Sequence, residues 1–427
     1  MKVFIITFGC KVNQYESQII LEDFIKEGFL KASSELDADI VIVNSCTVTA
    51  ESDKKVKKTL RRIRKGNRES VIVLTGCMPQ AFPGRDFSNA DIVLGNSNKS
   101  EILQKVMTFL VNKHEIIDIT PYESKCNFDP FKIESFNERM RAFIKIEDGC
   151  NRFCSYCIIP YARGRVRSKP IKDLFDEVQN LAYNGYNEIV LVGINLSAYG
   201  QDIGLNLCDA VEAVCNIPKV KRVRLGSLEP DHMGENIIKR LSKQTKLCPQ
   251  FHLSLQSGCD ETLKRMNRHY TSEEYFKVVS DIRKNFNNAS ITTDVMVGFP
   301  GEAELEFIKS LEFVQKVGFA KVHVFPYSIR PGTRAATFEN QVAPLEKEKR
   351  VHKMIEVTNK SRQEFLNLQV KNVEEVLFEK SIDDGFFEGY TKNYVPVIVR
   401  SNENLNSKIL KVKINTAKDN HCIGEIV

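Results

Sequence analysis

The sequence lacks any long hydrophobic run and any repetitive segment. None of its 427 residues fall in an apolar stretch approaching the ~20 residues of a membrane-spanning helix. It has no low-complexity tract and no heptad repeat, and its net charge of +6 is too small to indicate a partner by itself. This composition excludes a membrane-embedded or fibrous protein and predicts a globular chain with a full core and several domains.

The N-terminus lacks a convincing export signal. Lys2 precedes VFIITF, and the following FGC is faintly similar to a lipoprotein cleavage site. However, the apolar run is shorter than the ~7–15 residues of a signal core, and Cys10 comes too early. We therefore expect a cytoplasmic protein with no membrane association.

Histidine is scarce, with seven residues, whereas cysteine occurs twelve times. In a reducing compartment this number of cysteines favours metal or cluster ligation over disulfides. Cys150, Cys154 and Cys157 form C-x3-C-x2-C within EDGCNRFCSYCIIP, directly after a predicted strand. Zinc normally takes four ligands, and no fourth Cys or His lies nearby. A cubane iron–sulfur cluster held by three thiolates would keep one iron open for a small molecule, so a cluster is the favoured interpretation and structural zinc the alternative.

Strands and helices alternate through most of the chain. Residues 1–118 predict a parallel α/β sheet, because near-continuous apolar runs at 3–8, 39–45, 70–76 and 91–95 are each separated by helical stretches. Residues 119–138 are predicted to be a linker, and Cys126 within it has no partner at ligand spacing.

Residues 139–368 repeat the alternation six times and predict an open (β/α)6 barrel with chemistry on the loops that follow its strands. The predicted strands are 141–147, 188–193, 222–227, 251–256, 291–298 and 320–327, and a charged helix at about 344–368 would close the barrel. Residues 369–427 predict a small all-β barrel, whose eight basic and nine acidic residues do not by themselves support nucleic-acid binding.

Three further cysteines share one topological position. Cys10, Cys46 and Cys77 are 36 and 31 residues apart, and each follows a predicted parallel strand. These intervals match one βαβ step of ~30 residues. If the strands are neighbours, the three thiols lie along the carboxyl edge of the sheet, where such folds bind ligands. A single cysteine there is usually a packed thiol, but three equivalent positions predict a second three-cysteine cluster.

The C-x3-C-x2-C motif with Tyr156 between its last two cysteines resembles the radical S-adenosylmethionine superfamily. The resemblance implies that the open iron chelates the methionine moiety and that one electron releases a 5′-deoxyadenosyl radical. Polar residues that end later strands are then expected to face the cofactor. Together with Tyr156 these are Asn195, Glu229, Gln256, Asp294 and the stretch FPYSIRPGT at 325–333. Each could equally cap a helix when considered alone.

The two cysteine trios and the order of the segments resemble the methylthiotransferases over nearly the whole chain. That family combines an N-terminal methylthiotransferase domain (here 1–118), a radical barrel (139–368) and a C-terminal TRAM domain (369–427). The stretches GCKVNQYES, RAFIKIEDGCNRFCSYCIIPYARGRVRS and VGINLSAYG are most similar to the branch that acts on N6-threonylcarbamoyladenosine beside the tRNA anticodon.

The resemblance implies a tRNA methylthiotransferase with two [4Fe–4S] clusters and S-adenosyl-L-methionine. The cluster of Cys150, Cys154 and Cys157 would generate the radical that takes hydrogen from C2 of the adenine. The cluster of Cys10, Cys46 and Cys77 would carry the sulfur, which is methylated and then inserted. The expected partners are the tRNA anticodon stem-loop and an unidentified electron donor, and we expect a monomer.

Basic residues mark places where RNA could bind. The run KKVKKTLRRIRKGNR at 54–68 holds nine basic residues, and Arg163, Arg165, Arg167 and Lys169 follow the cysteine loop. We interpret both as phosphate contacts, with a solvated surface as an equally good explanation.

Other assignments stay open at this point. The substrate could be N6-isopentenyladenosine in tRNA or an aspartate of a ribosomal protein. A rival from another class is a non-catalytic RNA-binding protein stabilised by metal. Cys208, Cys215, Cys248, Cys259 and Cys422 lack ligand spacing and are interpreted as ordinary thiols.

Overall fold

The computed structural model describes residues 1–427 except 124–125, 130, 136–139 and 384. The predicted linker 119–138 therefore lies partly outside the described residues. Within the described part of the chain, no helix combines the length and apolarity needed to cross a membrane.

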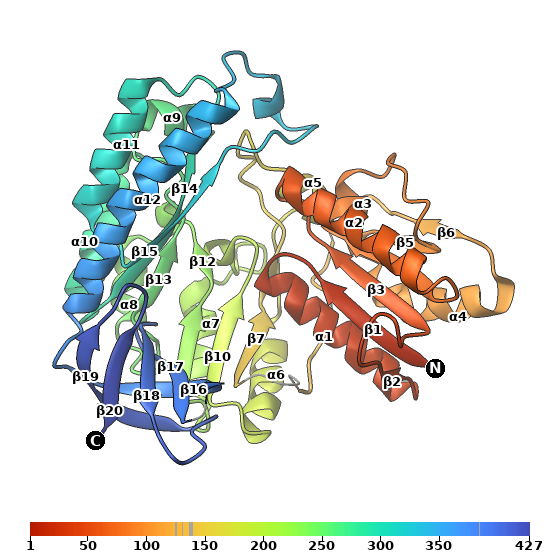
Figure 1. Ribbon diagram of the computed structural model, residues 1–427, viewed down its shortest axis with the longest axis horizontal. Helices are drawn as coiled ribbons and strands as arrows, with labels where there is room; N and C mark the ends of the chain where they lie inside the picture. The colour runs from red at the N-terminus through yellow and green to blue at the C-terminus, as the bar shows by residue number, and fades with distance from the viewer. Residues whose placement is uncertain (124–125, 130, 136–139, 384) are drawn as a thin grey trace.

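The N-terminal part of the chain is a six-stranded parallel sheet in the order β2-β1-β3-β4-β5-β6 (Figure 1). Its strands are β1 (Lys2–Thr7), β2 (Leu30–Lys31), β3 (Ile40–Ser45), β4 (Val71–Gly76), β5 (Ile92–Leu94) and β6 (Ile116–Asp118). Its helices are α1 (Lys11–Lys26), α2 (Ala50–Gly66), α3 (Cys77–Ala81) and α4 (Ile102–Asn112). Strands β3, β4 and β5 are buried along their whole length, which explains their continuous apolar sequences.

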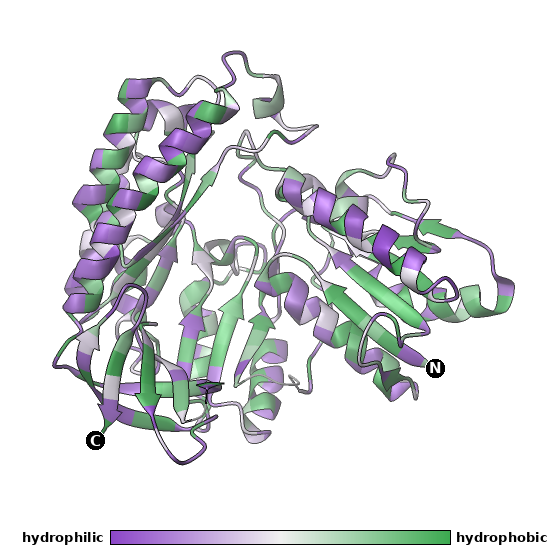
Figure 2. Cartoon of the chain, in the orientation of Figure 1, coloured by the Kyte–Doolittle hydropathy of each residue, from purple (hydrophilic) through white to green (hydrophobic). Residues whose placement is uncertain are grey.

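Helices cover both faces of this sheet. Phe24 of α1 and Val106 of α4 pack into the core on one face, whereas Val56 and Leu60 of α2 pack into the core on the other. Figure 2 shows the resulting pattern, with hydrophobic strands beneath a largely hydrophilic outer face of α2. Strand β1 lies between β2 and β3, so the strand order reverses beside it. In doubly wound sheets the carboxyl edge at such a reversal is where ligands bind.

The central part is an open arc of parallel strands wrapped by helices. One sheet has the order β11-β10-β7 and the next β12-β13-β14-β15. The strands are β7 (Arg141–Lys145), β10 (Glu188–Val192), β11 (Arg222–Leu225), β12 (Ser227–Leu228), β13 (Gln250–Leu253), β14 (Ser290–Val297) and β15 (Lys321–Pro326). The predicted strand 222–227 is thus divided at Gly226, whose amide donates to the carbonyl of Leu191 (2.8 Å) as the chain passes between sheets.

Helices enclose the outside of this arc. They are α6 (Ile171–Tyr183), α7 (Leu207–Cys215), α8 (Glu235–Leu241), α9 (Asp260–Arg265), α10 (Ser272–Asn285), α11 (Glu304–Val317) and α12 (Pro344–Asn367). A short antiparallel pair, β8 (Glu147–Asp148) and β9 (Arg167–Ser168), frames the cysteine loop and α5 (Ile159–Arg163). The predicted α/β architecture with a partial barrel is confirmed.

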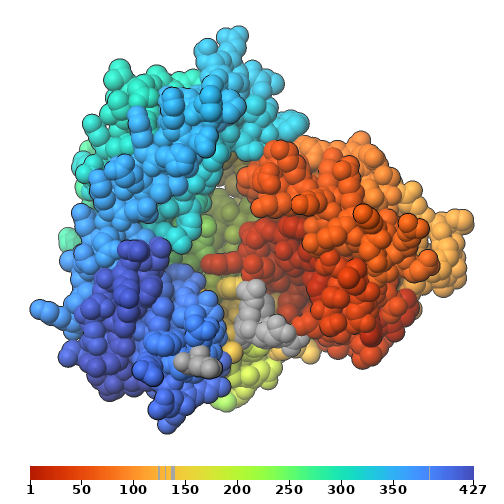
Figure 3. Space-filling view, viewed as in Figure 1, coloured from red at the N-terminus to blue at the C-terminus, as the bar shows by residue number. Residues whose placement is uncertain are grey.

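The C-terminal part is a closed β-barrel in the order β16-β17-β18-β20-β19. Its strands are β16 (Val373–Asp383), β17 (Phe386–Thr391), β18 (Pro396–Arg400), β19 (Ile409–Ala417) and β20 (Cys422–Ile426). It has its own core around Phe378 and Val397, which confirms the predicted all-β barrel. The space-filling view shows three lobes around a central hollow, at the bottom of which the partial barrel is visible (Figure 3).

Candidate functional site

The first group of candidate ligands lies at the carboxyl edge of the N-terminal sheet. Cys10, Cys46 and Cys77 directly follow or nearly follow β1, β3 and β4, and these strands pair side by side in parallel. Gly9 adopts φ +96°, and a Cβ at this position would lie 2.8 Å from Sγ of Cys46. The sheet therefore collects three strand exits that are spread over nearly seventy residues of sequence.

Burial disfavours the free thiolates at this edge. Cys46 and Cys77 are 7% and 3% exposed, whereas Cys10 is exposed. Burial, together with the nearby Cys77 thiol, raises the pKa of Cys46 to about 12. Such thiols lose their protons when a metal centre binds, because the metal supplies the compensating positive charge. The side-chain amide of Asn96 lies 3.5 Å from Sγ of Cys77 and is a further polar contact at the site.

The second group of candidate ligands lies on one short loop at the top of the partial barrel. Cys150, Cys154 and Cys157 are all partly exposed and follow β8. The backbone amide of Cys150 donates to the carbonyl of Gly164 (3.0 Å), and the backbone amide of Cys157 donates to the carbonyl of Cys154 (2.9 Å). Burial raises the pKa of Cys150 to about 12, and the neighbouring Cys154 adds to this shift.

Three polar side chains surround this loop. The amide nitrogen of Asn195 lies 4.0 Å from Sγ of Cys150, and its buried Oδ1 has no partner among the described residues. A guanidinium nitrogen of Arg268 lies 3.3 Å from Sγ of Cys154. Arg268 also forms an ion pair with Glu229. The sequence predicted Asn195 and Glu229 but missed Arg268, which no local motif distinguishes from other basic residues.

A cavity connects the loop to the inner face of the barrel. Tyr156, Gln256 and Asp294 line it together with Cys157, so the structure brings these predicted residues to one place. Gln256 adopts φ +65°, and its buried Oε1 has no partner within the described part of the chain. Val48 and Thr49, which follow Cys46, line the same cavity. The cavity is therefore built from both lobes that carry the cysteine trios.

Each cysteine trio supplies three thiols, one fewer than the four ligands of structural zinc. Across the described residues, no three or more His, Cys, Asp or Glu side chains are grouped so that they could hold a metal ion. A cubane has four irons and is larger than one ion, so three thiolates around it stand further apart than ligands of zinc. The orphaned amide oxygens of Asn195 and Gln256 are free acceptors for a polar cofactor such as S-adenosylmethionine.

The structure corrects the interpretation of the basic residues after the loop. Arg163, Arg167 and Lys169 are buried, and each pairs with carboxylates inside the protein, so they are not phosphate contacts. Arg165 is exposed. The 54–68 run forms most of α2, whose basic side chains are largely exposed and remain available to RNA. The five cysteines interpreted as ordinary thiols, Cys208, Cys215, Cys248, Cys259 and Cys422, are buried.

Comparisons with known families match both lobes. Residues 144–314 match the Radical SAM superfamily, and residues 2–95 match the Uncharacterized protein family UPF0004. The fold is similar to a radical S-adenosylmethionine methyltransferase from Kitasatospora setae solved with cobalamin and a [4Fe–4S] cluster. The TM-score is 0.58 at 13% identity, over 78% of this chain and 77% of the other. Together with the cysteine loop, the match of residues 144–314 identifies a radical S-adenosylmethionine domain.

Relatives with higher sequence identity match nearly the full length of this chain. The threonylcarbamoyladenosine tRNA methylthiotransferase MtaB of Bacillus subtilis is 35% identical over 99% of this chain and 95% of the relative. The protein of the same name from Thermotoga maritima is 38% identical over 91% of this chain and 89% of the relative. A tRNA-2-methylthio-N(6)-dimethylallyladenosine synthase of Pelotomaculum thermopropionicum is 32% identical over 98% and 96%. The chain belongs to the radical S-adenosylmethionine tRNA methylthiotransferase family, as the sequence predicted, and is an iron–sulfur transferase.

Proposed function

We propose that the protein methylthiolates C2 of N6-threonylcarbamoyladenosine beside the anticodon of tRNA. The observation that carries this substrate is the identity of the relatives named for it, which reaches 38% in Thermotoga maritima. Relatives named for dimethylallyladenosine are 32% to 35% identical and supply the second candidate substrate. The proposed partner is the anticodon stem-loop, whose unpaired bases can be splayed out into a protein pocket.

We assign the two cysteine trios to two clusters. Cys150, Cys154 and Cys157 would hold the first cluster, and Cys10, Cys46 and Cys77 the second. When bound, the first cluster and S-adenosylmethionine supply one-electron chemistry, which an aromatic C–H bond requires because it offers no acid–base route. Tyr156, Asn195, Glu229, Gln256 and Asp294 are proposed to bind and orient the cofactor. We propose that the adenine binds in the cavity shared by the two lobes, which Thr49 and Cys157 both line.

The substrate is tested by mass spectrometry of tRNA nucleosides from a strain that lacks the gene. Loss of the 2-methylthio derivative of threonylcarbamoyladenosine, restored by the wild-type gene and not by Cys150→Ala, supports the proposal. Loss of the isopentenyladenosine derivative instead would assign the second candidate. An unchanged nucleoside profile, together with loss of the methylthiolated aspartate from the ribosomal protein, would assign that aspartate as the substrate.

We propose that the chain consists of a first domain (1–118), a linker (119–138), a barrel domain (139–368) and a C-terminal domain (369–427), and that the three domains have separate roles. Residues 1–118 would present sulfur, residues 139–368 would generate the radical, and residues 369–427 would help to hold RNA. We further propose a cytoplasmic monomer that receives electrons from a separate donor protein. Anaerobic reconstitution with iron and sulfide should give about eight irons per chain, because each cubane holds four.

A further inference from the structure

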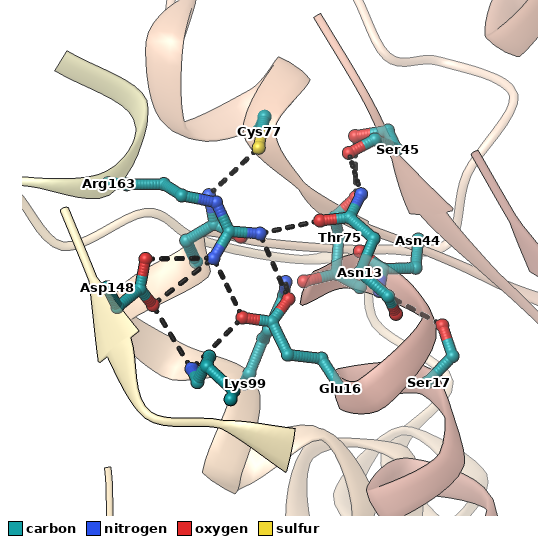
Figure 4. Close-up of polar contacts among 12 residues, drawn as sticks. Asn13, Glu16, Ser17, Asn44, Ser45, Thr75, Cys77, Lys99, Asp148 and Arg163 are labelled. Carbon is teal, nitrogen blue, oxygen red and sulfur yellow. Dashed lines mark hydrogen bonds and ion pairs between the residues drawn. The ribbon is translucent and has the colours of Figure 1, made fainter. Parts of the chain in front are cut away.

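A buried ion network lies beside Cys77 and includes Asp148 and Arg163, which flank the first cysteine trio in the sequence (Figure 4). Its members come from both lobes and are all less than a tenth exposed: Glu16, Lys99, Lys145, Asp148 and Arg163. The carboxylate of Glu16 accepts from Arg163 (2.8 Å) and Lys145 (3.2 Å) and pairs with Lys99. Asp148 accepts from Lys145 (3.1 Å) and Arg163 (3.1 Å). These five residues contribute three cations and two carboxylates, and Asp148 and Lys145 pair further with the buried Arg167 (3.5 Å) and with Asp129 (3.3 Å).

Arg163 lies at the centre of this network and is fully buried. One terminal nitrogen donates to both Glu16 and Asp148, and the other donates to Oδ1 of Asn13 (2.5 Å). Burial by itself would raise the pKa of Glu16, but the Arg163, Lys99 and Lys145 cations hold it well below its usual range. Removing one partner of these buried ion pairs leaves a charge uncompensated.

Asn13 connects Arg163 to the strand exits that carry the second cysteine trio. Its side-chain amide donates to the carbonyl of Phe8 (2.8 Å) and to the carbonyl of Ser45 (3.1 Å). Phe8 precedes Cys10 by two residues, and Ser45 directly precedes Cys46. The orientation of this one amide therefore ties two of the three strand exits together.

Arg163 follows the last cysteine of the first trio by six residues. It is the last residue of α5, which begins two residues after Cys157. Asn96 connects α5 to the second trio. Its side-chain amide contacts the carbonyl of Ala162 in α5 (2.6 Å) and Sγ of Cys77 (3.5 Å). The buried Nε of Arg163 has no hydrogen-bond partner among the described residues. Burial opposes its charge, but the nearby Asp148, Glu16 and Cys77 raise the pKa of Arg163 well above its usual value.

We propose that Arg163 is a positioning residue that holds the second cluster site at a fixed place relative to the first and supplies positive charge beside it. This inference rests on the proposed function, which needs both sites to act on one adenine. A carbon radical formed at one site must meet the sulfur held at the other before it reacts elsewhere. A misplacement of ~1 Å can cost about 10²-fold in rate, so a rigid connection between the sites has a direct chemical use.

The test compares Arg163→Gln, Arg163→Lys and Asn13→Ala with the wild-type holoenzyme. We expect both clusters to load and 5′-deoxyadenosine to form at close to the wild-type rate. The yield of methylthiolated adenosine per 5′-deoxyadenosine should fall at least about tenfold, the lower end of effects seen for residues around metal ligands. Arg163→Lys should fall between wild type and Arg163→Gln, since lysine keeps the charge but not the forked geometry.

A second readout does not depend on tRNA. Pulsed electron paramagnetic resonance of the reduced protein should show a broader distribution of cluster-to-cluster distances in Arg163→Gln and Asn13→Ala, and the midpoint potential of the second cluster should shift in Arg163→Gln. Arg350→Gln is the control for loss of a buried arginine, because Arg350 binds Glu302 within the barrel lobe (2.8 Å). It should leave the spectra and the product ratio unchanged.

The outcomes separate this proposal from the proposed function. A wild-type product ratio and unchanged spectra in Arg163→Gln would overturn the positioning role. If Arg163→Gln does not fold, unchanged spectra and product ratio in Asn13→Ala and Arg163→Lys would overturn it. A wild-type enzyme that fails to modify threonylcarbamoyladenosine would instead overturn the proposed substrate, while the spectral comparison would still decide the role of Arg163.

Discussion

The two cysteine trios reach the same ligand count by opposite routes. Cys150, Cys154 and Cys157 lie within eight residues on one loop, whereas Cys10, Cys46 and Cys77 meet only because β1, β3 and β4 are neighbours. The first trio is half-buried throughout, and in the second, two of the three thiols are buried. A loop brings its ligands together locally, but the second site exists only once the sheet has formed.

Because of this difference, the two sites should be disrupted by different substitutions. The loop site depends on its own backbone and on contacts from distant side chains such as Arg268. The sheet site depends on strand register and on the close approach of neighbouring strand exits. Changes in the sheet should therefore affect the second site selectively, and changes in the loop should affect all chemistry.

The largest expected effect is that of Cys150→Ala. Formation of 5′-deoxyadenosine should fall more than about 100-fold, because losing a ligand exceeds the 10–100-fold cost of changing residues around ligands. Product formation should fall with it. The measurement is chromatography of anaerobic reactions, with Cys208→Ala as the control, since Cys208 is a buried thiol away from both trios in sequence. Retained 5′-deoxyadenosine in Cys150→Ala would contradict the assignment of the loop.

The next effect separates the two trios. Cys10→Ala should abolish methylthiolation but leave 5′-deoxyadenosine formation within about twofold, and iron should fall from about eight to about four per chain. Nucleoside mass spectrometry measures methylthiolation, chromatography measures 5′-deoxyadenosine, and iron analysis with Mössbauer spectroscopy measures the loss of the second cluster. Equal loss of both activities would show that the two sites are not independent.

A smaller effect tests the dependence of the second site on the sheet. Gly76 has φ +103°, and a Cβ there would lie 2.4 Å from the carbonyl oxygen of Ser45. Gly28 also has a positive φ, +85°, but no atom lies within 4 Å of its Cβ position. Gly28→Ala should cost about 1–3 kcal/mol of unfolding free energy from backbone strain. Gly76→Ala should cost about 1–3 kcal/mol more from the clash.

Denaturant unfolding measures this difference, and iron content reports the site. Only Gly76→Ala should lower the occupancy of the second cluster, because it alone displaces a strand exit that carries a ligand. Equal destabilisation by both substitutions would contradict the close approach of β3 and β4 as the cause.

The smallest effect concerns RNA binding by the lobe that carries the second trio. Lys54 and Lys58 are exposed on α2. Reversing both charges to Glu should weaken tRNA binding up to about tenfold and reduce the salt slope by about 0.7–0.9 per lost phosphate contact. Lys360→Glu on the exposed side of α12 is the control. An unchanged affinity and salt slope would show that α2 is only a solvated surface.

Much of this architecture followed from the sequence because its signals are local or periodic. The C-x3-C-x2-C spacing predicts one metal-binding loop, and apolar runs at βαβ intervals predict a parallel sheet whose strand exits share an edge. That periodicity was enough to place Cys10, Cys46 and Cys77 together. Gln256 and Asp294 both line the cavity beside the cysteine loop, although Asp294 lies within β14 and Gln256 lies three residues after β13.

Pairing between distant charges could not be predicted in this way. The sequence predicts Arg163 as an RNA contact, yet Arg163 is buried and donates to Glu16, which lies 147 residues away in the sequence. Arg268 contacts Cys154 across 114 residues, and nothing near it in the sequence indicates this.

The sequence by itself thus determined the two candidate ligand sets and the parts of the fold that carry them, since spacing and periodicity constrain local backbone geometry. Only the tertiary structure decided which basic residues face solvent and which connect the two sites. A charged side chain has the same local pattern in both cases, and its environment depends on which distant carboxylate the fold brings to it.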